Sequence, residues 1–188
     1  MKETSLVVAR TVETNGIGLN GGIPWKLNGD MKYFVKLTSK VEKEGNRNAV
    51  IMGRKTWFSI PPKFRPLNKR YNVILSRTMN QEEDIFDKER VSIQTSLKEA
   101  FEHLDKMNDI EKIFIIGGSE VYSEALKWER CKKLFITEIY EDIECDTFFP
   151  TFDYNTFELD INHKPDGMDQ NIVEGDIRYS FCLYKRSN

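Results

Sequence analysis

Short, continuous runs of apolar residues recur along the chain and predict strands that are buried on both faces. The run at residues 113–116, Ile-Phe-Ile-Ile, is rich in β-branched side chains, as the middle of a parallel sheet requires. Similar runs lie at residues 6–9, 49–52, 72–75, 91–93 and 133–137. Near the end of the chain, residues 156–161 and 177–184 alternate between apolar and polar. This pattern predicts a terminal antiparallel pair of strands, joined through Pro165-Asp166-Gly167 and a long loop.

Segments with helical spacing separate several of these runs. Residues 28–38 carry an apolar stripe, and Asn28 is a residue type that can cap the start of a helix. Ser119 is the expected cap of a later helix. Strands that alternate with helices predict an α/β fold with a central, mostly parallel, twisted sheet and helices on both faces. We expect a single domain over residues 1–188.

Glycine or serine directly follows three of the predicted strands and suggests binding sites for anions. Gly117-Gly118 opens one helix, and Gly53 precedes another that begins at Arg54. Free backbone N–H groups and the helix dipole favour a phosphate at such a junction. Ser76-Arg77 follows the third strand. The carboxyl ends of parallel strands meet at one edge, where ligands bind in open α/β sheets. Tight turns without a ligand remain the alternative.

Residues 16–22 contain a formal G-x-G-x-x-G, but their context argues against a dinucleotide fingerprint. Ile23-Pro24-Trp25 follows instead of a helix, and no strand closes with an acidic residue near position 40. We therefore expect a mobile, glycine-hinged loop that carries Leu19 and Trp25 over a bound ligand.

Asp30 lies on the same face of the predicted 28–38 helix as Phe34, which is four residues further on. An acid in the first turn can simply complement the helix dipole. The alternative is a carboxylate that faces a cleft and binds a cationic or amidine-like group, because a buried carboxylate needs a partner. The sequence pattern leaves both interpretations open.

Composition narrows the class of protein. The chain has 188 residues and a formal net charge of −2, which gives no basic face for nucleic acid. Its three cysteines, Cys131, Cys145 and Cys182, lack metal-site spacing and predict reduced thiols. Neither a run of about 18 apolar residues nor an apolar signal at the N-terminus is present. We expect a cytoplasmic protein that binds no metal ion, no membrane and no nucleic acid.

Motifs spread over nearly the whole chain follow one another in the order that they have in a known family. They include Gly16-Ile17-Gly18, Ile23-Pro24-Trp25, Val50-Ile51-Met52-Gly53, Lys55-Thr56-Trp57-Phe58-Ser59-Ile60-Pro61, Arg65-Pro66-Leu67, Leu75-Ser76-Arg77, Ile116-Gly117-Gly118-Ser119 and Asp146-Thr147-Phe148-Phe149-Pro150. In these motifs the chain resembles the dihydrofolate reductases of the eukaryotic type. The resemblance implies a monomeric oxidoreductase that uses NADPH to reduce 7,8-dihydrofolate to 5,6,7,8-tetrahydrofolate. It also implies a role in one-carbon metabolism and thymidylate synthesis, and binding of antifolate inhibitors.

The resemblance assigns roles to individual residues of the substrate site. Asp30 would hold the 2-amino group and N3 of the pteridine, with Thr137 behind it, and Trp25 would complete the catalytic set. A water at the edge of the pteridine would protonate N5 while C6 receives a hydride. Arg70 would pair with the α-carboxylate of the glutamate tail. The implied substrate-binding residues are Val7, Val8, Asp30, Met31, Phe34, Ile60, Phe64, Leu67, Arg70, Ile116, Tyr122 and Thr137.

A second set would hold the cofactor. Arg54 and Arg77 would bracket the 2′-phosphate of NADPH, and Gly117-Gly118, joined in the family by a cis peptide, would pass the pyrophosphate. The implied cofactor-binding residues are Ala9, Ile17, Gly18, Leu19, Gly21, Gly53, Arg54, Lys55, Thr56, Leu75, Ser76, Arg77, Thr78, Ile116, Gly117, Gly118, Ser119, Glu120, Val121 and Tyr122.

The chain departs from the vertebrate members at three positions. Asp30 stands where they carry Glu, as it does in bacterial members, Met31 replaces Phe, and Phe64 replaces a polar residue, which leaves inhibitor selectivity open. Two other classes remain to be weighed. A pyrimidine reductase of the riboflavin pathway would share the fold and cofactor but lose the pairing of Arg70 and Asp30. A non-catalytic nucleotide-binding module would need only the glycine turns.

Overall fold

A twisted sheet, nine of whose strands lie in the described part of the chain, organises the molecule. The structure is a computed structural model and describes residues 1–84, 87–165 and 170–187. Across the main path of the sheet the strands are β10 (Ile172–Glu174), β11 (Ile177–Arg186), β7 (Cys131–Ile139), β1 (Glu3–Thr11), β6 (Ile110–Ile115), β3 (Arg47–Gly53), β4 (Arg70–Leu75) and β5 (Val91–Gln94). A further strand, β9 (Phe157–Leu159), pairs with β11 off this path.

The sheet is mostly parallel, as the continuous apolar runs predict. All the pairs from β7 through β1, β6, β3 and β4 to β5 are parallel, whereas β11 runs antiparallel to β7, β9 and β10. The predicted antiparallel end of the chain is confirmed. The three-residue strand β10 was not predicted, and Asp166 and Gly167 of the expected connection lie outside the described residues.

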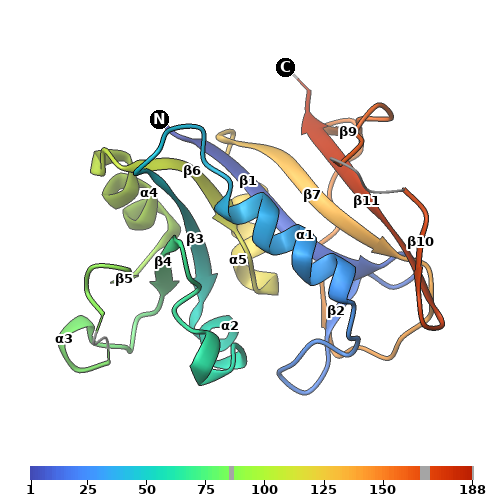
Figure 1. Ribbon diagram of the computed structural model, residues 1–188, viewed down its shortest axis with the longest axis horizontal. Helices are drawn as coiled ribbons and strands as arrows, with labels where there is room; N and C mark the ends of the chain where they lie inside the picture. Colours follow the sequence, from blue (N-terminus) through green and yellow to red (C-terminus); the bar gives the residue numbers. More distant parts are fainter. Residues whose placement is uncertain (85–86, 166–169, 188) are drawn as a thin grey trace.

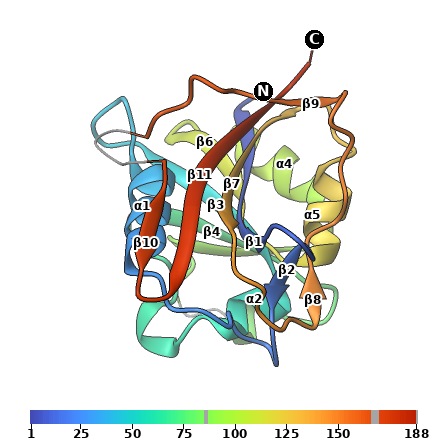
Figure 2. The same ribbon diagram turned by 90° about the vertical axis from the view of Figure 1, so that its right-hand side faces the viewer.

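Helices cover both faces of the sheet (Figures 1 and 2), which confirms the predicted α/β class. On one face lie α1 (Asn28–Ser39) and α2 (Arg54–Ser59), and on the other lie α4 (Leu97–Lys106) and α5 (Ser119–Ala125). Two short elements, the 3-10 helix η1 (Pro62–Phe64) and α3 (Gln81–Asp84), lie in the connections around β4. Residues 49–52 of β3 are fully buried, because helices pack on both sides of this strand.

Two predicted helix caps are wrong, for different physical reasons. Asn28 does not cap α1, since its own backbone N–H and that of Gly29 donate to the Glu174 carboxylate of β10. Ser119 is the first residue of α5, and its hydroxyl donates to the carbonyl of Phe148. At α1 a carboxylate that is distant in sequence accepts the hydrogen bonds that a side-chain cap would otherwise accept, whereas at α5 the serine hydroxyl is engaged as a donor elsewhere.

The glycine-rich segment near the N-terminus forms strand pairing, not a helix junction. Gly16–Gly18 is strand β2, which pairs with β8 (Thr147–Phe148), and Leu19 bridges to Gly22. The next helix begins only at Asn28, which confirms that the formal G-x-G-x-x-G is not a dinucleotide fingerprint. The mobility of this loop stays a prediction.

Two further observations concern the cysteines and the length of the helices. Cys131, Cys145 and Cys182 are free thiols. Of the helices in the described residues, none combines the length and the apolar character needed to cross a membrane.

Candidate active site

One face of α1 carries three polar or aromatic side chains at four-residue intervals. Asp30, Phe34 and Thr38 therefore follow one another along the side of the helix that faces the sheet. Asp30 accepts a hydrogen bond of 2.6 Å from the Thr137 hydroxyl of β7. At the other end of the face, the Thr38 hydroxyl accepts one of 2.8 Å from the guanidinium of Arg70, the first residue of β4. The predicted pairings of Asp30 with Thr137 and with the Phe34 face are thus present in the structure.

The Asp30 carboxylate lies in a setting that disfavours its charge. Burial raises the pKa of Asp30, the Thr137 hydrogen bond opposes this rise, and the nearby Glu174 carboxylate adds to it. Within the described residues, no lysine, arginine or histidine forms an ion pair with Asp30. A half-buried carboxylate without a cationic partner is suited to a ligand that brings hydrogen-bond donors to it.

Arg70 is buried as well, with 5 % of its surface exposed. Burial lowers the pKa of its guanidinium. It donates to the carbonyl of Asn68 and to Thr38, and its charged carbon lies 5.8 Å from the centre of the Phe34 ring. The described part of the chain supplies no carboxylate to it. A buried guanidinium in this state can bind an incoming carboxylate in a bidentate geometry.

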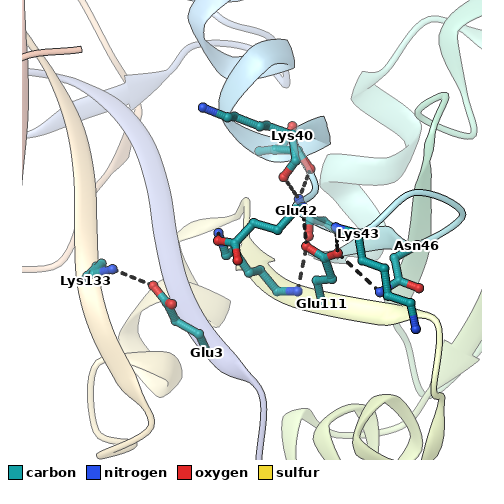
Figure 3. Close-up of polar contacts among 10 residues, drawn as sticks. Glu3, Lys40, Glu42, Lys43, Asn46, Glu111 and Lys133 are labelled. Atoms are coloured by element: carbon teal, nitrogen blue, oxygen red, sulfur yellow. Dashed lines mark hydrogen bonds and ion pairs between the residues drawn. The ribbon is translucent and has the colours of Figure 1, made fainter. Parts of the chain in front are cut away.

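Hydrogen bonds from strands β3 and β6 of the sheet fix the C-terminal end of α1, which holds Thr38 against Arg70. The side-chain amide of Asn48 donates to the carbonyls of Thr38 and Lys40. The Glu111 carboxylate of β6 accepts hydrogen bonds from the backbone N–H groups of Glu42 and Lys43 (Figure 3). Because these contacts hold the loop after α1 on the sheet, Thr38 has a fixed position from which to orient Arg70.

Most of the predicted apolar substrate residues meet in one cluster on the α1 side of the sheet. Val7 is buried there, and its partly buried neighbours in that cluster include Phe34, Ile60, Leu67 and Ile116. Val8 packs in the cluster on the opposite face, because successive side chains of a strand alternate, so its side chain does not join the others. Met31 and Phe64 are 54 % and 58 % exposed, which leaves both free to contact a ligand from the solvent side.

Several of the predicted cofactor residues, those around Gly53, Ser76 and Gly117, gather where three parallel strands end. Gly53 of β3 pairs with Leu75 of β4, and its N–H donates to the carbonyl of Gly117, just beyond β6. This places Arg54 and Arg77, which follow the first two strands, at the same edge as the glycine pair. Both arginines are exposed, and neither forms an ion pair among the described residues. The expected convergence of the strand ends is confirmed.

The glycine pair forms a cradle of bare backbone, and the backbone conformation of Gly117 favours glycine. The Gly117–Gly118 peptide is cis, as the resemblance implies, and Gly117 has a φ of +130°. A Cβ on Gly117 would lie 3.4 Å from the Thr56 hydroxyl and 3.5 Å from that of Tyr122, and one on Gly118 would lie 3.5 Å from the Thr56 hydroxyl. Exposed cations beside this narrow backbone surface fit a group that carries phosphates.

The remaining predicted site residues divide between the core and the surface. Tyr122 is buried and donates a hydrogen bond of 2.6 Å to the carbonyl of Val7. Trp25 and Ala9 are partly buried together beside Tyr33, near the start of α1. Ile17, Leu75 and Val121 are partly buried and pack against the opposite core. Gly18 and Ser76 are buried, Leu19 and Ser119 are half-buried, and Gly21, Lys55, Thr78 and Glu120 are exposed.

Sequence reasoning missed three residues that surround Asp30. They are Glu174 of β10, Tyr179 of β11 and Tyr33, which lies three residues after Asp30 on α1. The β-branched pair Ile172-Val173 followed by a Gly175-Asp176 turn is a hairpin signal that could have revealed β10. Nothing in the local sequence indicates that a carboxylate on this hairpin reaches α1. Among the described residues, no group of three or more His, Cys, Asp or Glu side chains could hold a metal ion.

Comparison with known proteins points to one family. The family described as Dihydrofolate reductase matches residues 3–186. The protein "Dihydrofolate reductase" of Heliothis virescens is 40% identical over 180 residues, 96% of each chain, and that of Gallus gallus is 39% identical over 185 residues, 96% of this chain and 95% of its own. The "Bifunctional dihydrofolate reductase-thymidylate synthase" of Daucus carota is 43% identical over 98% of this chain, which spans 34% of that longer protein.

Proposed function

The chain belongs to the dihydrofolate reductase family, and we propose that it reduces 7,8-dihydrofolate to 5,6,7,8-tetrahydrofolate with NADPH as the hydride donor. Membership of the family makes the chain an oxidoreductase with a dihydrofolate substrate and a nicotinamide cofactor. The choice of NADPH over NADH, and the residue roles that follow, are our proposals.

The observation that carries the proposal is a pair of opposite charges, Asp30 on α1 and Arg70 beside its C-terminal end, neither of which forms an ion pair among the described residues. Asp30 and Thr38 are eight residues apart, which is about 12 Å along a helix that rises 1.5 Å per residue. A ligand that lies along this face meets a carboxylate at one end, the Phe34 ring in the middle and the Arg70 guanidinium at the other end. Dihydrofolate has the complementary order, with an amidine-like pteridine, an aromatic linker and a glutamate carboxylate.

We infer that Asp30 binds the 2-amino group and N3 of the pteridine, while the Thr137 hydroxyl keeps its carboxylate oriented. Among the described residues of the proposed site, no side chain is placed to protonate N5 directly, so a water at the edge of the pteridine delivers that proton. The net reduction consumes one proton at N5. Because burial raises the pKa of Asp30, the site retains a proton to higher pH than an exposed aspartate would.

At the other edge of the site, the chain holds the cofactor through backbone and cations. NADPH, when bound, supplies the hydride that C6 of the pteridine receives. The cradle at Gly117-Gly118 would hold the pyrophosphate, and the exposed Arg54 and Arg77 at the same edge of the sheet would bracket the 2′-phosphate. The apolar side chains of Val7, Ile60 and Ile116, which share one cluster, would exclude water from the space between the two bound ligands.

The test of this function compares substrates. NADPH oxidation is followed by the absorbance of the reduced nicotinamide, with dihydrofolate or with a ribosylated pyrimidine as the substrate and an antifolate as the inhibitor control. We expect turnover only with dihydrofolate and its loss on adding the antifolate. Turnover with the pyrimidine would instead favour a riboflavin-pathway reductase. Oxidation with neither compound would leave a nucleotide-binding module.

A further inference from the structure

The N-terminal end of α1 is held by a carboxylate from the other end of the chain. Glu174 of β10 accepts hydrogen bonds from the backbone N–H groups of Asn28, at 2.6 Å, and Gly29, at 2.8 Å. Figures 1 and 2 both show β10 beside α1. Two of the helix's unpaired N–H groups are thus satisfied by a negative charge at the positive end of the helix dipole. Asp30 is the next residue of the helix, so this contact fixes the turn that carries the proposed catalytic carboxylate.

The contact is built into the packing of three elements. The Tyr179 hydroxyl of β11 donates to Glu174 at 2.9 Å, which gives the carboxylate its third donor. Gly29 is required at its position, because a Cβ there would lie 2.3 Å from the Tyr179 hydroxyl oxygen and 3.1 Å from a Glu174 oxygen. A cavity of about 440 Å³, lined by residues that include Gly29, Ile172 and Glu174, lies beside this contact.

Glu174 is also the negatively charged neighbour of Asp30. Its backbone hydrogen bonds with Gly29 and Asn28 lower the pKa of Glu174, which keeps it ionised, and its charge contributes to the raised pKa of Asp30. Among the residues that the structure describes, the other groups that face Asp30 are Thr137 of β7, Tyr179 of β11 and Tyr33 of α1 itself. Burial raises the pKa of both tyrosines, so both remain neutral, and the cation that acts on Glu174 is Lys32.

We propose that Glu174 is a positioning residue for Asp30, which fixes the first turn of α1 and presents a negative charge to the catalytic carboxylate. The inference rests on the proposed function of Asp30. It assigns to the β10–β11 hairpin a part in the chemistry that goes beyond packing. Through this contact, a strand of three residues influences both where Asp30 lies and at which pH it carries a proton.

The first experiment separates charge from structure with Glu174→Gln, which keeps an acceptor oxygen but removes the charge. The matched control is Glu158→Gln, which removes a carboxylate from β9, at the opposite end of β11. The carbon-13 resonance of the Asp30 carboxyl group, assigned with Asp30→Asn, reports its titration in the protein without ligands. The pH dependence of kcat with NADPH and dihydrofolate reports the same group during turnover.

We expect Glu174→Gln to move the Asp30 titration and the alkaline limb of the kcat profile to lower pH, and Glu158→Gln to move neither. Equal profiles in Glu174→Gln and the wild-type protein, with both folded, would overturn the inference. A wild-type protein without NADPH-dependent turnover would defeat the proposed function alone, since the carboxyl titration needs no activity. A merely structural cap would lower the melting temperature and leave the titration unchanged.

The second experiment tests the close approach of Gly29 to the Tyr179 hydroxyl. Gly29→Ala places a methyl group against the Tyr179 hydroxyl, so we expect a lower melting temperature and a lower kcat. Tyr179→Phe removes the oxygen atom that would clash, and the double variant Gly29→Ala/Tyr179→Phe should recover much of the melting temperature lost in Gly29→Ala alone. Additive losses in the double variant would contradict the close approach on which the inference depends.

Discussion

The Thr137 hydroxyl donates a hydrogen bond of 2.6 Å to Oδ1 of Asp30, from the centre of the sheet to the first turn of α1. Thr137 is 3 % exposed, and its strand neighbours across the sheet are Ala9 and Phe181. The hydrogen bond stabilises the ionised form of Asp30, whereas burial and the Glu174 charge stabilise the protonated form. The protonation state of the site is therefore a balance that single substitutions can move in either direction.

Replacement of Thr137, which donates the hydrogen bond to Asp30, should raise the pKa of Asp30. In Thr137→Val, Asp30 loses the interaction that lowers its pKa, so the alkaline limb of the kcat profile should move to higher pH. Thr95→Val is a matched control, because the Thr95 hydroxyl also donates at 2.6 Å to a carboxylate, that of the surface residue Glu99. A limb that moves to lower pH in Thr137→Val would show that the hydrogen bond does not stabilise the carboxylate.

Removal of the acid itself should have the largest effect on turnover. Asp30→Asn keeps the shape of the side chain but can neither ionise nor transfer a proton. We expect kcat at neutral pH to fall by a factor on the order of 10²–10⁴, the range for a positioned acid–base group. The measurement is steady-state NADPH oxidation with saturating dihydrofolate, with the exposed Asp142→Asn as the control. A variant that keeps most of its activity would exclude Asp30 from the mechanism.

Arg70 should contribute more to the binding of dihydrofolate, through the glutamate tail, than to the rate of hydride transfer. Arg70→Leu removes a bidentate contact of two charge-assisted hydrogen bonds, each worth about 1.5–3 kcal/mol, so KM for dihydrofolate should rise on the order of 10²- to 10⁴-fold. The value of kcat should change less, because the tail is remote from C6. A dihydropteridine without the glutamate tail should be reduced equally by both proteins. The reverse pattern, a fall in kcat with KM unchanged, would mean that Arg70 lies elsewhere relative to the substrate.

The two exposed arginines at the strand ends should determine the choice of cofactor. Each can form charge-assisted hydrogen bonds of about 1.5–3 kcal/mol with a 2′-phosphate, so the wild-type protein should prefer NADPH to NADH. Arg54→Ala and Arg77→Ala should each raise KM for NADPH by on the order of 10- to 100-fold and change KM for NADH little. Arg178→Ala, an exposed arginine of β11, provides the control. Similar KM values for both cofactors in the wild-type protein would contradict this assignment.

Local sequence predicted the parts of the site that depend on periodicity, and it missed those that depend on tertiary contacts. The four-residue spacing of Asp30 and Phe34 placed both on one face of α1, and the apolar runs placed Gly53 and Gly117 at strand ends. By contrast, the Arg70–Thr38 contact joins residues 32 positions apart, and Glu174 reaches Gly29 across 145 positions. Asn28 has the local propensity of a cap, but the distant carboxylate takes that role.

The ionised carboxylate of Asp30 should also reduce the free energy of unfolding of the protein at neutral pH. Its pKa is raised in the folded state above an unfolded value near 3.8, so folding favours its protonated form. Below the unfolded pKa, Asp30 is neutral in both states and resembles asparagine. As pH rises through the folded pKa, the folded state has to ionise a carboxylate that burial disfavours, and stability is lost. An asparagine side chain at this position would carry no such cost, and its oxygen can still accept the Thr137 hydrogen bond.

We therefore expect Asp30→Asn to melt at a higher temperature than the wild-type protein at pH 7–8, by roughly 2–4 °C if the gain is about 1 kcal/mol in a chain of this size. The difference in Tm between the two proteins should shrink as the pH falls towards the unfolded pKa. Calorimetry of both proteins without ligands, at matched ionic strength from acid to neutral pH, gives this difference directly. Addition of dihydrofolate should reverse the order, because the ionised carboxylate then has the hydrogen-bond donors that the described residues do not provide. Lower stability of Asp30→Asn at neutral pH would mean that the carboxylate is stabilised in the folded protein, and that the raised pKa assigned to it is wrong.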